Sequence, residues 1–239
     1  MRASDFEFRN RFWIFGLLYF AGFMPYWLHD QNALATVLNV FAPKLGEAAY
    51  HVAFGIAALI MLVAAMLRTW ATAYLTTTVM KHTEVQSASL VADGPYRHVR
   101  NPLYLGNLLM TLSFGALASR VGAIVTIVGV TVFIYRLIGR EEAQLEATQG
   151  ESFRRFRAAV PRLLPSLAPR LPASGRQPEW KQAFAGESMM WGFTVTAAIF
   201  AVTLHTGIPF AIALTLSIAS SFFFRGRIEP QKAKVTSAD

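Results

Sequence analysis

The sequence predicts an all-α protein, a polytopic membrane helix bundle with about six transmembrane helices. Of its 239 residues, 54% are apolar and 15% are charged, and the mean hydropathy is +0.39. Long uncharged apolar runs recur along the chain, a pattern that is typical of membrane-spanning helices. We therefore expect an integral, multi-pass membrane protein rather than a soluble domain.

Six uncharged runs approach the length that spans the hydrocarbon core, about 20 helical residues at a rise of about 1.5 Å each. The fourth run is short and needs Leu137, Ile138 and Gly139, or a locally thinned bilayer, to cross. The first run lacks a small-residue cleavage site, so we expect it to be retained as a span. The runs cover residues 12–28, 48–67, 102–119, 121–135, 188–204 and 207–224.

The placement of lysine and arginine predicts the orientation of these spans. With six spans and the N-terminus inside, every lysine and arginine except Lys44 and Arg120 falls in a cytoplasmic segment. Cytoplasmic loops carry an excess of positive charge in membrane proteins. We therefore expect both termini to be cytoplasmic, and we attribute most of the net charge of +8 to topology.

Four segments are expected along the chain: N-terminal transmembrane helices (1–80), a core (81–167), a proline-rich linker (168–187), and a C-terminal transmembrane hairpin with a basic tail (188–239). The chain has no cysteine, which excludes disulfides and thiolate catalysis. Its histidines lack metal-ligand spacing, so no metal site is predicted. The basic charge comes without a nucleic-acid-binding motif, so no nucleic-acid partner is expected.

The most informative stretch is DGPYRHVRNPLYLG, residues 93–106. Gly94 and Pro95 predict a turn, and Asn101 followed by Pro102 predicts a helix start with asparagine as the N-cap. Helix N-termini attract anions, and Arg97, His98 and Arg100 add positive charge beside this one. We therefore expect a carboxylate or phosphate ligand at the membrane surface here.

A second cytoplasmic stretch, residues 136–187, contains an amphipathic segment. Phe153, Phe156 and Val160 recur at helical spacing, and arginines occupy the opposite face. This pattern predicts a helix that lies in the membrane interface beside anionic headgroups. Five prolines follow and interrupt helix formation before the last two spans.

These segments together resemble a known family. GPYRHVRNPLYLG, followed after two spans by REEAQL and FRRFRAAVPRLLP, is similar to the isoprenylcysteine carboxyl methyltransferase and phospholipid methyltransferase superfamily of integral membrane enzymes. The resemblance covers about residues 90–165, and its motifs have two parts at a fixed spacing.

The resemblance implies S-adenosylmethionine as methyl donor, bound at the cytoplasmic face, and a lipidic acceptor that arrives from the bilayer. That acceptor would be a lipid or a prenylated small molecule or protein. Asn101 stands where the family often has histidine, so this position cannot titrate. The cofactor-binding residues carried over are Leu90, Val91, Tyr96, Asn101, Pro102, Leu103, Tyr104 and Glu141.

One departure affects the acceptor. The arginine that faces the acceptor in the family usually lies about four residues before the first glutamate, where this chain has Leu137. Arg136 or Arg140 is therefore expected to orient a carboxylate acceptor. An amine acceptor must first lose a proton, and Glu142 is the candidate base. Carboxylate O-methylation is favoured, and phospholipid amine N-methylation remains the alternative.

Two readings of other classes also remain. Sterol reductases share a related helical architecture, and an enzyme of that type would bind NADPH instead of the methyl donor. A non-enzymatic membrane protein, such as a small transporter or scaffold, is the third reading. A Rossmann-type methyltransferase is excluded, because no GxGxxG motif follows a strand.

Overall fold

The computed structural model describes residues 1–27, 31–41, 46–81 and 92–228, and the regular structure within these ranges is helical. An isolated bridge between Asn32 and Ser119 is the one extended pairing found there. The helices are α1 (Asp5–Arg9), α2 (Arg11–Phe23), η1 (Met24–Trp27), α3 (Ala33–Phe41), α4 (Gly46–Lys81), η2 (Gly94–Arg97), α5 (Pro102–Leu117), α6 (Arg120–Gln149), α7 (Glu151–Ala159), α8 (Trp180–Gly186), α9 (Ser188–Thr203) and α10 (Ile208–Ile228).

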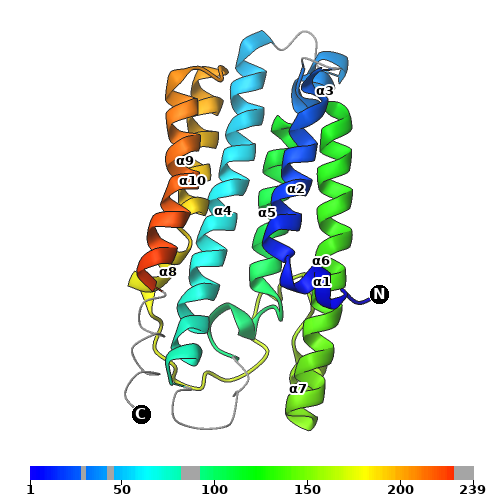
Figure 1. Cartoon of the computed structure of the whole chain (residues 1–239), viewed down its shortest axis with the longest axis vertical. Coiled ribbons are helices and arrows are strands. Elements are labelled where there is room, and N and C mark those ends of the chain that lie inside the picture. Colours follow the sequence, from blue (N-terminus) through cyan, green and yellow to red (C-terminus); the bar gives the residue numbers. More distant parts are fainter. Residues whose placement is uncertain (28–30, 42–45, 82–91, 229–239) are drawn as a thin grey trace.

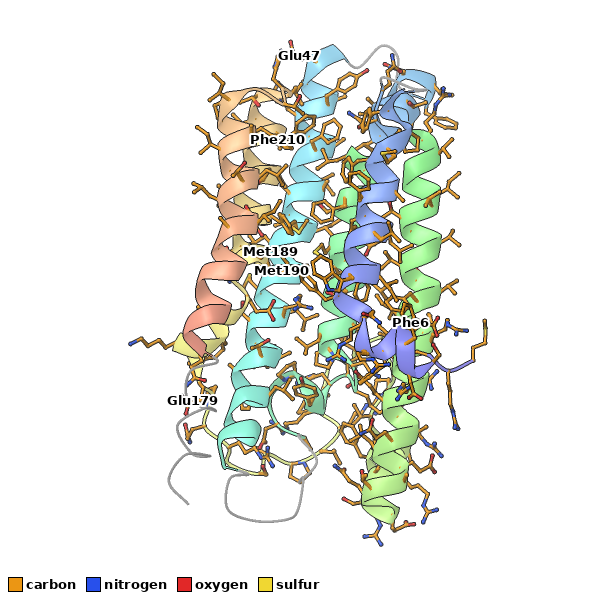
Figure 2. The ribbon with its side chains drawn as sticks, in the orientation of Figure 1. Phe6, Glu47, Glu179, Met189, Met190 and Phe210 are labelled. Atoms are coloured by element: carbon orange, nitrogen blue, oxygen red, sulfur yellow. The ribbon has the colours of Figure 1, made fainter. Side chains whose placement is uncertain are left out.

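The long helices α2, α4, α5, α6, α9 and α10 run alongside one another (Figure 1). The short elements η2, α7 and α8 lie at the lower end of this bundle, which we call the basic end, and α3 lies at the opposite end. Glu47, at the start of α4, and Glu179, just before α8, mark the two ends (Figure 2). The motif of residues 93–106 therefore opens at the basic end.

Two helices, α4 and α6, are long and apolar enough to cross a membrane, and α8 with α9, bent by 61°, makes a third candidate. Helices α5 and α10 are apolar but shorter. The count of six spans thus remains a prediction, whereas the all-helical fold is confirmed. Exposed apolar side chains cover the outer face of α6, such as Ile124, Val128 and Val132, as expected for a surface that faces lipid.

Helices α2 and α6 pack with their backbones in close contact. A Cβ atom on Gly122 would lie 1.7 Å from the carbonyl oxygen of Gly22. One turn or more toward the basic end, Leu18 lies against Gly129, and Phe15 stacks edge-on with Phe133 at 5.1 Å. Small residues let helices approach in this way when the solvent is lipid. The two helices are antiparallel, and this contact fixes their register.

The C-terminal hairpin is part of the bundle. Helix α9 packs on α4 through an edge-to-face contact between Phe54 and Phe200, with ring centroids 4.9 Å apart. Near the basic end, Trp191 Nε1 donates to Thr69 Oγ1 at 3.0 Å. These contacts place α9 against α4 along its length.

Two local expectations at the basic end have different outcomes. Helix α5 begins at Pro102 with Asn101 as N-cap residue, as predicted, although the Asn101 side chain does not cap the helix. The interfacial position expected for α7 stays a prediction, but its apolar face packs on protein. Phe153 and Phe156 are buried against protein, within a cluster that includes Leu145 and Leu171. An amphipathic pattern predicts a helix, but it does not say what covers the apolar face.

Candidate functional site

Tyr104 and Glu141 form a hydrogen-bonded pair between the first turn of α5 and the later part of α6. The Tyr104 hydroxyl donates to Glu141 Oε1 at 2.8 Å. Phe133 and Leu137 precede Glu141 by two helical turns and by one, and both are buried in an apolar cluster against which Tyr104 packs. The carboxylate thus lies at the edge of an apolar layer, where charge-assisted hydrogen bonds are strong.

Glu142 is the centre of a second group, the Glu142 hub, which comprises Glu142, Arg100 and Arg162. The Glu142 side chain is 8% exposed. Arg100 Nε donates to Oε1 at 3.1 Å, and Arg162 donates to both carboxylate oxygens. Asn101 Nδ2 also donates to Oε1, at 3.3 Å. The base role expected for Glu142 stays a prediction, which this geometry disfavours because arginines already occupy both of its oxygens.

The chain after α7 returns over the motif as an ordered strap, residues 160–176. Its backbone pairs with the motif from end to end, through Arg100 N to Pro161 O (2.8 Å), Ser166 N to His98 O (2.9 Å), Arg170 N to Arg97 O (2.8 Å) and Ser174 N to Asp93 Oδ1 (2.8 Å). The proline-rich stretch is therefore a structural cover of the site as well as a linker.

The cations of the motif hold this strap. Arg97 Nε donates to Leu171 O at 2.7 Å, and His98 Nδ1 lies 2.9 Å from Ser166 O. Arg100 donates to carbonyls at the end of α7 as well as to the Glu142 hub. The expected carboxylate or phosphate ligand beside these three side chains stays a prediction, and part of their donors already bind the protein itself.

Asp93 anchors the far end of the strap. Burial alone raises the pKa of Asp93, but donors from Ser174 and from the Arg176 backbone amide outweigh it, so the pKa lies below its usual range. A carboxyl group with a lowered folded pKa stabilises the fold above its unfolded pKa of about 3.9, and this contribution is lost as the pH falls through the folded pKa.

We expect the Asp93→Asn variant to have a lower melting temperature than wild type at neutral pH. Between about pH 5 and about pH 2, its melting temperature should fall less steeply, because it lacks the carboxyl that takes up the proton. Melting temperatures of both proteins across this range provide the measurement. Glu151→Gln, a change at an exposed carboxylate, is the matched control, and a wild-type slope in Asp93→Asn would contradict the anchoring role.

The two arginines predicted to orient the acceptor bind the N-terminal segment instead. Arg136 makes a bidentate pair with Glu7, through Nε at 3.0 Å and Nη2 at 2.7 Å. Arg140 pairs with Asp5. The hydrogen bond from Arg136 is the main cause that lowers the pKa of Glu7 to about 2. The role expected for both arginines stays a prediction, which this arrangement disfavours because each already has a carboxylate partner.

A buried ion pair that sequence reasoning missed connects α4 to the bend between α8 and α9. Arg68 Nε and Nη2 donate to Glu187 at 2.7 and 3.0 Å, and Thr72 donates to the same carboxylate at 2.7 Å. Arg68 Nη1 donates to Asn107 Oδ1 at 2.7 Å. A Cβ on Gly106 would lie 2.4 Å from Arg68 Cγ, so the last glycine of the motif makes room for this side chain.

The structure describes some of the other residues predicted to bind the cofactor, but not all of them. Tyr96 is buried in η2, and burial raises the pKa of its hydroxyl, which therefore stays neutral. Pro102 is buried and Leu103 is half-buried in the first turn of α5. Leu90 and Val91 lie outside the described residues. Within the described ranges, no cluster of histidine and carboxylate side chains could hold a metal ion.

Comparison with known proteins identifies the central part of the chain. Residues 51–147 match the model of the isoprenylcysteine carboxyl methyltransferase (ICMT) family. No curated protein and no solved structure matches the chain. The matched segment contains most of α4, all of η2 and α5, and α6 through Ala147, which includes Glu141. The match confirms the family resemblance that the motif predicts, and residues 51–147 are similar to the ICMT family.

Proposed function

We propose that the chain is an S-adenosylmethionine-dependent methyltransferase that methylates the carboxylate of a lipidic acceptor, of the isoprenylcysteine type, at the cytoplasmic face of a membrane. Six spans with both termini in the cytoplasm complete the proposal. The similarity to the ICMT family supports the reaction class. The observation that carries the site is the hydrogen bond between Tyr104 and Glu141, which joins the two parts of the family motif.

The side chains around this pair suit the proposed methyl donor. S-Adenosylmethionine carries an ammonium, a sulfonium and several hydroxyl groups, and a carboxylate such as Glu141 can accept hydrogen bonds from the ammonium or the hydroxyls. The aromatic faces of Tyr96 and Tyr104 suit a sulfonium cation. Both phenols are close to a buried layer, so a bound cation would be shielded from water.

The proposed reaction needs alignment more than acid–base chemistry. The donor supplies a methyl group on a positively charged sulfur. A carboxylate oxygen of the acceptor forms the new bond to the methyl carbon, the sulfur–carbon bond breaks, and its electron pair remains on sulfur. No proton moves, so the residues of the chain must position the reactants and exclude water. The strap and the cluster around Leu137 are suited to that work.

The Glu142 hub favours a carboxylate acceptor over an amine. An ammonium acceptor requires a base, and the expected base has both oxygens bound to arginines. A carboxylate acceptor is already a nucleophile at neutral pH. Methylation of a phospholipid amine is the alternative, and a comparison of carboxylate and amine acceptors tests it.

Calorimetric titration of detergent-purified protein with S-adenosylmethionine tests the proposal. We expect micromolar binding by wild type, and binding weaker by about tenfold or more in Glu141→Gln, because that change removes a charge-assisted hydrogen bond. Tyr104→Phe should weaken binding by a smaller factor, since it removes only the hydroxyl that holds Glu141 in place.

The matched control is Glu146→Gln, on the same helix, whose carboxylate pairs with Arg157 at the surface. This variant should bind the donor as wild type does. Absence of binding by wild type, or binding of NADPH in its place, would contradict the proposed function. Equal loss in Glu146→Gln and Glu141→Gln would contradict the assignment of the site.

A further inference from the structure

Arg11 lies on the face of α2 that packs against α6. It precedes Phe15, Leu18 and Gly22 by four, seven and eleven residues, so the four positions share one face of the helix. Gly22 contacts Gly122, and the contacts described above then descend toward the basic end. Because the helices are antiparallel, the position one turn beyond Phe15 lies near the level of α6 one to two turns beyond Phe133.

That level of α6 contains Leu137 and Glu141. Arg11 Nη1 donates to Phe8 O at 3.1 Å, and its guanidinium carbon lies 4.5 Å from the centre of the Phe8 ring. Phe8 packs against Leu137 in the same cluster as Tyr104. The positive charge of Arg11 interacts electrostatically with both Tyr104 and Glu141. The guanidinium is therefore a neighbour of the proposed donor site.

Arg11 and Arg97 differ from the other arginines around the site, because each binds a carbonyl rather than a carboxylate. Arg136, Arg140, Arg100, Arg162 and Arg68 each bind a carboxylate of the protein. Among the described residues, Arg11 makes a hydrogen bond to a carbonyl but no ion pair with a carboxylate. It is also exposed. An incoming carboxylate could thus bind Arg11 without breaking an existing ion pair.

We propose that Arg11 binds and orients the acceptor carboxylate beside the Tyr104–Glu141 pair. The proposal rests on the proposed function and adds to it a residue from α2, which lies outside the segment that matches the family. A planar guanidinium can hold a carboxylate through two parallel hydrogen bonds, which fixes the direction of its oxygens. It would also repel an ammonium group, so this residue selects a carboxylate acceptor over an amine.

The experiment compares wild type with Arg11→Gln, Arg11→Lys and Arg9→Gln. Arg9 is an exposed cation two residues away, so its replacement removes the same charge from the same segment. Donor affinity is measured by calorimetry. Initial rates are measured at saturating donor, with N-acetyl-S-farnesylcysteine as the carboxylate probe and phosphatidylethanolamine vesicles as the amine probe.

We expect KM for the carboxylate probe to rise by about tenfold to a hundredfold in Arg11→Gln, which is the effect of losing a hydrogen-bonded charge. KM of Arg11→Lys for this probe should lie between those of Arg11→Gln and wild type, because lysine keeps the charge but lacks the two parallel N–H donors of a guanidinium. Donor affinity should change far less than this KM in both variants. Arg9→Gln should match wild type in donor affinity and in KM for both probes.

Three results would overturn the role of Arg11. The first is an unchanged KM in Arg11→Gln, and the second is a loss of donor affinity in that variant equal to its loss of acceptor affinity. The third is methylation of phosphatidylethanolamine without methylation of the carboxylate probe. Failure of the proposed function is a separate result, because wild type itself would then neither bind the donor nor methylate either probe.

Discussion

Replacement of Glu142 by alanine is expected to destabilise the protein by about 3 kcal/mol. Removing one partner of a buried ion pair costs about 3 to 5 kcal/mol, since the other charge is left buried and unpaired. The Arg100 side chain is 11% exposed, so its charge would stay buried without a carboxylate. The Arg162 side chain is 44% exposed and can turn toward water. The lower end of the range is therefore expected. The melting temperature of detergent-purified protein provides the measurement.

The same variant should loosen the strap. Arg162 lies within residues 160–176, and its pairing with Glu142 on α6 fixes the strap beside Asn101. Hydrogen exchange of the strap amides should therefore increase in Glu142→Ala. Glu151→Ala, which removes an exposed carboxylate from α7, is the control and should change the melting temperature little. Equal effects of the two replacements would contradict the hub as a stabilising centre.

Much of the helical architecture could be predicted from the sequence, because apolar runs and helix signals are local. The α5 start at Asn101 and Pro102 follows from two adjacent residues. Helix α6 continues far beyond the predicted run of 121–135, through Gln149. Charged residues end an apolar run but not a helix, so composition predicts where a span ends rather than where the helix ends.

The partners of the arginines could not be predicted in the same way. Arg136 pairs with Glu7, a residue 129 positions away. The motif arginines bind mostly backbone carbonyls, and every residue of a chain has one. A pattern of positive charge predicts topology and a possible anion, yet it does not reveal which acceptors the fold brings near.

The candidate site was predictable residue by residue but not as a constellation. The family motif points to Tyr104 and to Glu141 separately, and the structure brings them into hydrogen-bond contact. Their role in binding the cofactor remains a prediction. Glu142 is also a candidate from the sequence, but its neighbours Arg100 and Arg162 change its chemistry. Adjacent glutamates on one helix point about 100° apart, so they meet different surroundings.

Glu187→Ala is expected to destabilise the protein by about 3 kcal/mol, the lower end of the cost of leaving a largely buried arginine without its carboxylate. The side chains of Glu187 and Arg68 are 7% and 20% exposed, and their pairing is bidentate. Arg68 lies in the family segment and Glu187 begins the C-terminal hairpin. Loss of this pair should therefore separate α9 from α4 at the basic end as well as lower the melting temperature.

Two further variants test whether the lost ion pair causes this destabilisation. Glu179→Ala removes an exposed carboxylate just before α8 and should have little effect. The double variant Arg68→Met with Glu187→Leu should recover much of the lost stability, because apolar side chains of similar volume can replace a buried ion pair at little cost. A melting temperature of Glu187→Ala equal to that of Glu179→Ala would show that the hairpin is held by its apolar contacts with α4 alone. Recovery in the double variant would instead show that the unpaired charge of Arg68 is the cause of the loss.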